Sequence, residues 1–380
     1  MIVSDFTALE PAIDPNNRIS FLLDWEMTMK CNLDCSYCET GTHGGHDNSI
    51  PHPELADCIK TIDFMFKYVD LYMNHKPRGI KQVILNVYGG ESLHHPEILK
   101  ILETCKDVYQ TEYADNWKLT ITTTTNAIIS DKKLAKIIPF IDEFTVSYHS
   151  ENTLKQKEQF KKNLLSIRDS GKRLKCVILM HADPDLFEDS NKFEKWCDQN
   201  QIRTLPRQLD HPQSKTEFNY NEQQVKWFDN LYKKKSWKIN DIGNNVAKRV
   251  DDKFDLADSG RACCGGRSLC ADANYKSRNF FVDNKFPDWY CSVNEFFLFV
   301  KQVNGEIYVN KDCKMSFQGQ VAPIGNLSDT SSLLDWTRGN LEQNTMPIIQ
   351  CKKYRCYCGL CAPKAKDLDT FITIMRKFRK

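Results

Sequence analysis

Short apolar, β-branched runs alternate with amphipathic helical segments from residue 20 to about residue 208. Leu55, Ile62 and Val69 recur at helical spacing after the first run, and Ile98 and Ile101 do so after the second. A regular alternation of strands and helices predicts a parallel sheet built of βα units. The predicted strands are residues 21–29, 82–88, 118–124, 143–149, 174–180 and 202–208.

The alternation fails after residue 220, where one helical stretch leads into a region of short strands. Alternating residues around Asn304 and Gly305 predict a hairpin over 291–313, and IGNL at 324–327 precedes a short helix. Apolar residues Phe371, Ile374 or Met375, and Phe378 predict a docked C-terminal helix. We therefore predict three units: a sheet domain over residues 1–220, a linker helix region over 221–255, and a cysteine-rich domain over 256–380 that ends in that helix.

Composition excludes several protein classes. Hydrophobic residues make up 41% and charged residues 27%, which fits a folded globular chain and excludes a disordered one. The formal net charge of +2 is too small to attract nucleic acid or an anionic membrane surface. The sequence contains neither a signal-peptide pattern nor an apolar run of about 18 residues, so we expect a cytoplasmic protein without a membrane anchor.

The chain contains 16 cysteines, and most are closely spaced, which favours metal ligation over disulfides. Three form one group near residue 35, and nine follow residue 262. The other four fall on apolar faces of predicted elements and are expected to be small core residues: Cys58, Cys105, Cys176 and Cys197.

Unusual residues follow the predicted strands. The first strand is followed by Cys-x3-Cys-x2-Cys, the second by Gly-Gly-Glu, the third by an asparagine, and the fourth contains a serine near its end. In a βα barrel these ends form one rim, where active sites are built. Three thiolates would leave one iron of a four-iron cluster open, whereas a zinc site would need a fourth ligand, for which His43 and His46 come closest.

These motifs resemble the radical S-adenosylmethionine (SAM) superfamily. The resemblance implies a partial (β/α)6 TIM-like barrel in which Cys31, Cys35 and Cys38 hold a [4Fe-4S] cluster whose open iron chelates SAM. Its implied cofactor-binding residues are Tyr37, Gly89, Gly90, Glu91, Asn126 and Ser147. In the family pattern the Gly-Gly-Glu segment binds the amino group of SAM. Asn126 and Ser147 could equally be strand-end caps.

The order of hairpin, Gly-Asn, short helix and terminal cysteine group resembles the SPASM extension of radical SAM enzymes. It implies one or two auxiliary [4Fe-4S] clusters, with Cys263 as a spare thiol. The terminal group departs from the family pattern and has no cysteine after it, so zinc remains an alternative there. The implied ligands are Cys264, Cys270, Cys291, Cys313, Cys351, Cys356, Cys358 and Cys361.

By this resemblance the protein is an oxidoreductase-type enzyme that cleaves SAM reductively to a 5′-deoxyadenosyl radical. The radical would abstract hydrogen from a peptide or protein side chain, leading to a crosslink, an epimer or an oxidised product. A flavodoxin- or ferredoxin-type donor is expected because no flavin or nicotinamide motif is present. Alternatives are radical dehydrogenation or rearrangement of a small metabolite, and a non-enzymatic iron-sulfur or zinc scaffold.

Two further points bear on the substrate. Only 30 residues precede Cys31, too few for an N-terminal peptide-binding domain, so a peptide would be read elsewhere or the substrate is small. Several residues near predicted strand ends could donate protons or hydrogen, but each is also an ordinary loop residue: Tyr148, His149, His181, Asp183 and Asp210.

Overall fold

A computed structural model describes residues 8–9, 18–38, 46–75, 80–209, 219–228, 230, 288–310, 316, 321–351 and 364–379. Its main feature is a nine-stranded sheet in the order β11-β10-β9-β2-β3-β4-β5-β6-β7. The strands β2 to β7 are parallel neighbours in chain order, which confirms the predicted βα architecture. They are β2 (Arg18–Thr28), β3 (Ile80–Gly89), β4 (Lys118–Thr125), β5 (Glu143–His149), β6 (Arg173–Met180) and β7 (Thr204–Gln208).

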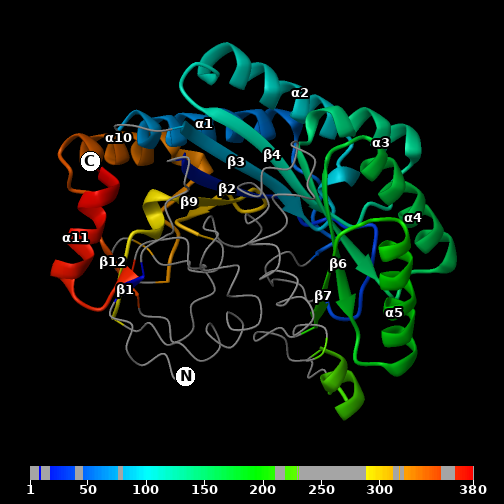
Figure 1. Cartoon of the computed structure of the whole chain (residues 1–380). Helices are drawn as coiled ribbons and strands as arrows, with labels where there is room; N and C mark the ends of the chain where they lie inside the picture. Colours follow the sequence, from blue (N-terminus) through cyan, green and yellow to red (C-terminus); the bar gives the residue numbers. More distant parts are fainter. Residues whose placement is uncertain are drawn as a thin grey trace.

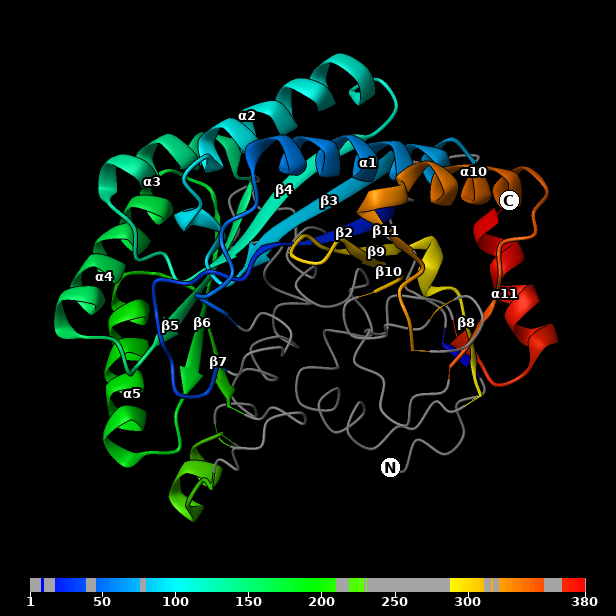
Figure 2. The same cartoon turned by 180° about the vertical axis from the view of Figure 1, so that it is seen from behind.

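The crossover helices all follow one face of this curved sheet (Figures 1 and 2). They are α1 (Leu55–Asn74), α2 (Ile98–Val108), α3 (Asp131–Ile137), α4 (Leu154–Asp169) and α5 (Pro184–Gln199), with a π-helical turn at Tyr109–Tyr113. Local signals begin several of them: Thr153 and Gln156 form a capping box for α4, and Asp183 caps α5 ahead of Pro184.

The core lies between this face and the helices. Alternate residues of β2, such as Phe21, Leu23 and Trp25, are buried there, and α1 buries Ile62 and Val69. The four cysteines predicted as core residues, Cys58, Cys105, Cys176 and Cys197, are at most 1% exposed, so that prediction is confirmed. The other residues of each strand face the opposite side of the sheet, because side chains alternate along a strand.

The predicted hairpin is confirmed and extends the same sheet. Strand β9 (Phe297–Lys301) pairs antiparallel with β10 (Glu306–Tyr308), and Gly305 between them has a φ of +70°. Strand β9 also pairs parallel with β2, and β11 (Gly325–Asn326), within the IGNL segment, pairs with β10. The predicted short helix follows as α10 (Thr330–Glu342) and contacts α1.

A smaller sheet in the order β1-β13-β8-β12 lies beside the last helix, α11 (Leu368–Arg379), at the opposite end of the molecule from α5 (Figure 1). Its strands are β1 (Ala8–Leu9), β8 (Tyr290–Cys291), β12 (Ile349–Gln350) and β13 (Lys364–Ala365). Phe371 and Met375 of α11 are buried against Ala365 and Tyr290, as the apolar pattern of the tail predicted. The predicted linker region ends within residues 231–287, which lie outside the described part, so the domain boundaries stay predictions.

Candidate active site

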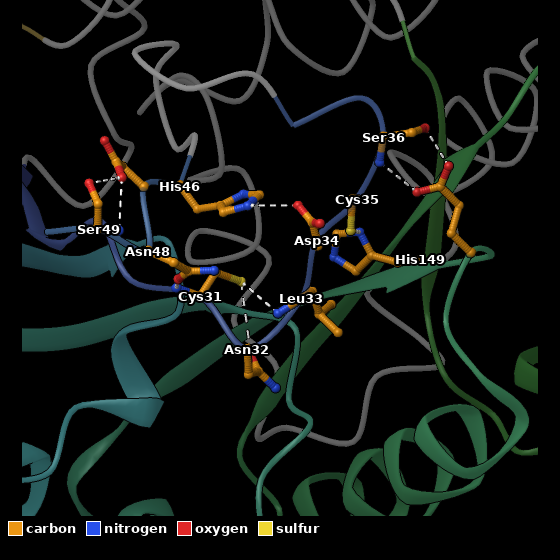
Figure 3. A network of polar contacts seen from close by, with 12 residues as sticks. Cys31, Asn32, Leu33, Asp34, Cys35, Ser36, His46, Asn48, Ser49 and His149 are labelled. Carbon is orange, nitrogen blue, oxygen red and sulfur yellow. Dashed lines mark hydrogen bonds and ion pairs between the residues drawn. The ribbon is translucent and has the colours of Figure 1, made fainter.

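The three-cysteine motif forms the loop after β2, at the carboxyl end of the sheet (Figure 3). The backbone N–H of Cys31 donates to Asn48 Oδ1 at 2.9 Å, and that of Cys38 donates to the Cys35 carbonyl at 2.9 Å. The Leu33 N–H points to Cys31 Sγ at 3.4 Å. Local hydrogen bonds therefore fold the segment back on itself instead of leaving it extended.

The two glycines at the end of β3, Gly89 within the strand and Gly90 directly after it, pack against this loop. The Gly90 N–H donates to the Thr28 carbonyl at 2.7 Å, and the Glu91 N–H donates to the Lys30 carbonyl at 2.7 Å. A Cβ atom would lie 2.1 Å from the Thr28 oxygen at Gly89, and 2.4 Å from the Lys30 oxygen at Gly90. The glycines are thus required for contact with the cysteine-bearing chain, and their contact with SAM stays a prediction.

Glu91 is completely buried, and its carboxylate accepts three hydrogen bonds. The donors are the Thr125 hydroxyl at 2.7 Å, the Asn126 N–H at 2.6 Å and the Leu93 N–H at 3.1 Å. Burial raises the carboxyl pKa to about 7, against the lowering effect of these donors. In this structure Glu91 is a positioning residue for the loop after β4, and its predicted contact with an amino group stays a prediction.

Asn126 connects Glu91 to the cysteine loop. Its side-chain amide lies 3.7 Å from Cys31 Sγ and donates to Asn32 Oδ1 at 2.8 Å, while its own Oδ1 accepts the Ile128 N–H. Asn126 therefore both caps the strand end and contacts a predicted ligand. Ser147 is half-buried on β5, where strand alternation places it on the same face as His149.

His149, the last residue of β5, reaches the middle cysteine (Figure 3). Its Nδ1 atom lies 3.4 Å from Cys35 Sγ and 2.6 Å from the Tyr37 hydroxyl oxygen. The Tyr37 and His149 rings are stacked, with centroids 6.0 Å apart and an interplanar angle of 6°. The predicted cofactor residue Tyr37 is thus part of the support of Cys35.

A carboxylate just beyond β5 holds the same loop. Glu151 accepts hydrogen bonds from the Ser36 N–H at 2.8 Å and from the Ser36 hydroxyl, and it lies 3.8 Å from His181 Nε2. The sequence pattern did not single out Glu151 or Asn48. Glu151 could have been found by the same strand-end rule that found Asn126, whereas Asn48 lies in a loop that no pattern connects to Cys31.

Burial favours the protonated form of the three motif thiols. Burial raises the pKa of Cys31 to about 11 and that of Cys35 to about 12, although the Tyr37 hydrogen bond offsets part of the second rise. Burial also raises the pKa of Cys38. Iron would reverse this preference, because a coordinated thiol is deprotonated.

The motif supplies three cysteine thiols from one short loop. Within the described residues, no three Cys, His, Asp or Glu side chains converge on one metal-ion position. In a four-iron cluster each cysteine binds a different iron, so its ligand sulfurs stand farther apart than those around one ion. The Cys31, Cys35 and Cys38 thiols are the ligands, in type and number, that the family resemblance assigns to the cluster, which stays a prediction.

The second cysteine group is described at two positions. Cys291 is buried on β8 opposite Ile349 of β12, and Cys351, which follows β12, donates its N–H to the Trp289 carbonyl at 2.8 Å. Cys291 thus lies on one strand of the small sheet, and Cys351 comes directly after the neighbouring strand. The other predicted ligands lie outside the described residues: Cys264, Cys270, Cys313, Cys356, Cys358 and Cys361, together with the spare Cys263.

A solved structure similar to this chain is that of polyhistidine-tagged anSMEcpe with bound AdoMet. It is 14% identical, the match covers 87% of this chain and 82% of that one, and the TM-score is 0.50. The chain shares the α/β fold of that protein, with its largely parallel sheet. SuiB of Streptococcus suis bound to S-adenosylmethionine is also 14% identical, over 84% of this chain and 66% of that one, but its TM-score of 0.46 is too low to support an argument.

No protein-family model matches the chain, and no curated protein sequence is significantly similar to it. The likeness to the tagged anSMEcpe structure therefore shows the fold of this chain alone. None of the helices in the described ranges is long and apolar enough to span a membrane.

Proposed function

We propose that the protein is a radical SAM enzyme that modifies a peptide or protein side chain. The observation that carries this proposal is the hydrogen-bonded convergence of three loops at the carboxyl end of the sheet. Gly90 and Glu91 bond to the backbone that leads into Cys31, and Asn126 bonds to Cys31 itself. These residue types are the ones that the family resemblance assigns to the cluster and to SAM.

Each residue has a defined part in this arrangement. Cys31, Cys35 and Cys38 would hold the [4Fe-4S] cluster and leave one iron open for SAM. When bound, the cluster supplies the electron that cleaves SAM to a 5′-deoxyadenosyl radical, which abstracts hydrogen from the substrate. Glu91 keeps Asn126 at Cys31, and the close contact at Gly89 and Gly90 holds the SAM-binding segment against the cysteine loop.

The peptide class is supported by the SPASM-like order of the C-terminal part. Its hairpin and short helix are present. Cys291 on β8 and Cys351 directly after the neighbouring strand β12 would share an auxiliary cluster. The protein anSMEcpe, whose fold this chain shares, has a structure with AdoMet and a Kp18Cys peptide. Two auxiliary clusters, a flavodoxin- or ferredoxin-type donor and a cytoplasmic location complete the proposal.

Iron content and SAM cleavage test the proposed function together. The wild-type chain and a variant with Cys31, Cys35 and Cys38 changed to Ala are reconstituted anaerobically, and iron, sulfide, zinc and 5′-deoxyadenosine are measured. We expect about twelve irons per chain in the wild type and about four fewer in the variant, since each cluster holds four. The variant should form no 5′-deoxyadenosine.

The outcomes separate the parts of the proposal. About four irons with zinc in the remainder would keep the radical SAM site but refute the auxiliary clusters and the peptide class that they support. Wild-type protein that binds iron and never cleaves SAM would be a scaffold and not an enzyme. The matched control changes Cys58 to Ala, because this buried cysteine lies on α1 among core residues and should leave the iron content unchanged.

A further inference from the structure

The environment of Cys35 differs from that of the other two motif cysteines. Its sulfur lies against two side chains that can donate hydrogen bonds, the His149 imidazole at 3.4 Å and the Tyr37 hydroxyl. The imidazole and the phenol are themselves 2.6 Å apart, so the three groups form one hydrogen-bonded triangle. In contrast, Cys31 is approached by the Asn126 amide and the Leu33 N–H.

The triangle is anchored in the sheet. His149 is paired with Leu179 of β6, and its 2.6 Å contact with the Tyr37 hydroxyl, whose ring is nearly parallel to the imidazole, orients the imidazole. Two residues later, Glu151 bonds both the N–H and the hydroxyl of Ser36, the neighbour of Cys35. The position of the Cys35 sulfur is thus determined by the end of β5, a rigid element, although Cys35 itself lies in a loop.

Such contacts matter for an iron-sulfur ligand. A thiolate accepts hydrogen bonds more strongly than a thiol, and hydrogen bonds to the sulfurs are among the factors that set the reduction potential of a cluster. Side chains that orient a ligand from behind commonly change metal affinity 10- to 100-fold when they are removed. A donor at His149 would stabilise the additional negative charge of the reduced cluster and raise its potential.

We propose that His149 is a positioning residue for the cluster. Its Nδ1–H is shared between the Tyr37 oxygen and the Cys35 sulfur, and the Tyr37 hydroxyl donates to the Cys35 thiolate. This inference rests on the proposed function, because it needs a cluster at Cys31, Cys35 and Cys38. His149 orients one ligand sulfur and makes the cluster easier to reduce, so it affects the electron-accepting step without touching the substrate. The imidazole takes this part in the tautomer that carries its proton on Nδ1.

Two substitutions at one position separate the hydrogen bond from packing. His149→Phe keeps an aromatic ring on Tyr37 but has no donor, whereas His149→Asn places an amide donor near the position of Nδ1. The reduction potential is read from the electron paramagnetic resonance signal that responds to added SAM, which distinguishes this cluster from auxiliary ones. The rate at which a chelator removes iron is measured in parallel, with His75→Gln at the exposed end of α1 as control.

We expect His149→Phe to shift the potential to a more negative value and to lose iron from this cluster at least about tenfold faster. His149→Asn should restore most of both properties, and His75→Gln should match the wild type. If His149→Phe fails to assemble, Tyr37→Phe removes one corner of the triangle and should shift the potential in the same direction. This inference alone would be overturned if an assembled His149→Phe variant had the wild-type reduction potential and lost iron at the wild-type rate. A wild-type protein without any cluster would overturn the proposed function.

Discussion

The contact between Gly90 and the cysteine loop gives the sharpest structural prediction. In Gly90→Ala the new Cβ would lie 2.4 Å from the Lys30 carbonyl oxygen and 2.6 Å from the Met29 oxygen. Both are backbone atoms and cannot turn aside as a flexible side chain would. The chain from Met29 to Cys31 has to move away from β3, which also strains the 2.7 Å hydrogen bond from the Gly90 N–H to Thr28.

The size of the effect follows from these two losses. Overpacking of a tight contact costs about 1–3 kcal/mol, and a lost hydrogen bond adds about 1 kcal/mol. We therefore expect Gly90→Ala to lower the free energy of unfolding by about 2–4 kcal/mol, which is roughly a 30- to 1000-fold change in the folding equilibrium. Because the displaced chain leads directly into Cys31, iron uptake at the motif should fall as well.

Urea unfolding of the apoprotein measures the stability, and anaerobic reconstitution measures the iron. The matched control is Gly339→Ala in α10, where a Cβ meets no atom within 4 Å and alanine should stabilise the helix by about 1 kcal/mol. The reasoning would be refuted if Gly90→Ala kept the wild-type urea midpoint and iron content. A loss of iron without a loss of stability would point to direct binding of SAM or the cluster instead of packing.

Three further predictions concern the buried acid, a histidine beside the site and the small sheet. Glu91→Gln should lower the free energy of unfolding by about 1–3 kcal/mol, because the NH2 group of glutamine cannot accept a hydrogen bond where one carboxylate oxygen of Glu91 does. An unchanged midpoint of urea unfolding would contradict this. Burial, and secondarily the charge of His95, lowers the pKa of His52 from its ordinary 6.5 to about 4. Between pH 6.5 and pH 4, His52 therefore binds a proton in the unfolded chain but stays neutral in the folded chain. Stability should therefore fall as the pH drops from 6.5 to 4, and His52→Gln should flatten that dependence in urea titrations at several pH values. If Cys291 and Cys351 share one cluster, changing either to Ser should remove about four irons on reconstitution, and the double variant should lose no more than the single ones.

The strands and the rim of the sheet could be predicted because they depend on local patterns. Alternating apolar residues define β5 with the ends that the structure shows, and unusual residues at strand ends pointed to the correct loops. The partner of the predicted hairpin could not be predicted. Its Asn-Gly turn is a local signal, but the pairing of β9 with β2 depends on which sheet edge is open after the whole barrel has formed.

The roles of individual site residues were harder to infer. Glycines beside a cysteine motif suggest room for a ligand, yet at Gly89 the space is filled by the Thr28 carbonyl, a neighbour that no spacing in the sequence reveals. Glu91 has the residue type expected for binding an amino group, but burial directs it to Thr125 and Asn126. His149 was one of several strand-end candidates, and only its distance to Cys35 distinguishes it.

The pairing of β9 with β2 also has a consequence for the order in which the chain can fold. Trp25 of β2 donates its indole N–H to Gln302, 277 positions along the chain, and contacts of such long sequence separation form slowly. During synthesis, β2 is therefore an edge strand until the ribosome has passed residue 301, and its backbone groups are open to pairing with other chains. The strand that precedes the cysteine motif thus gains its second neighbour only late in synthesis.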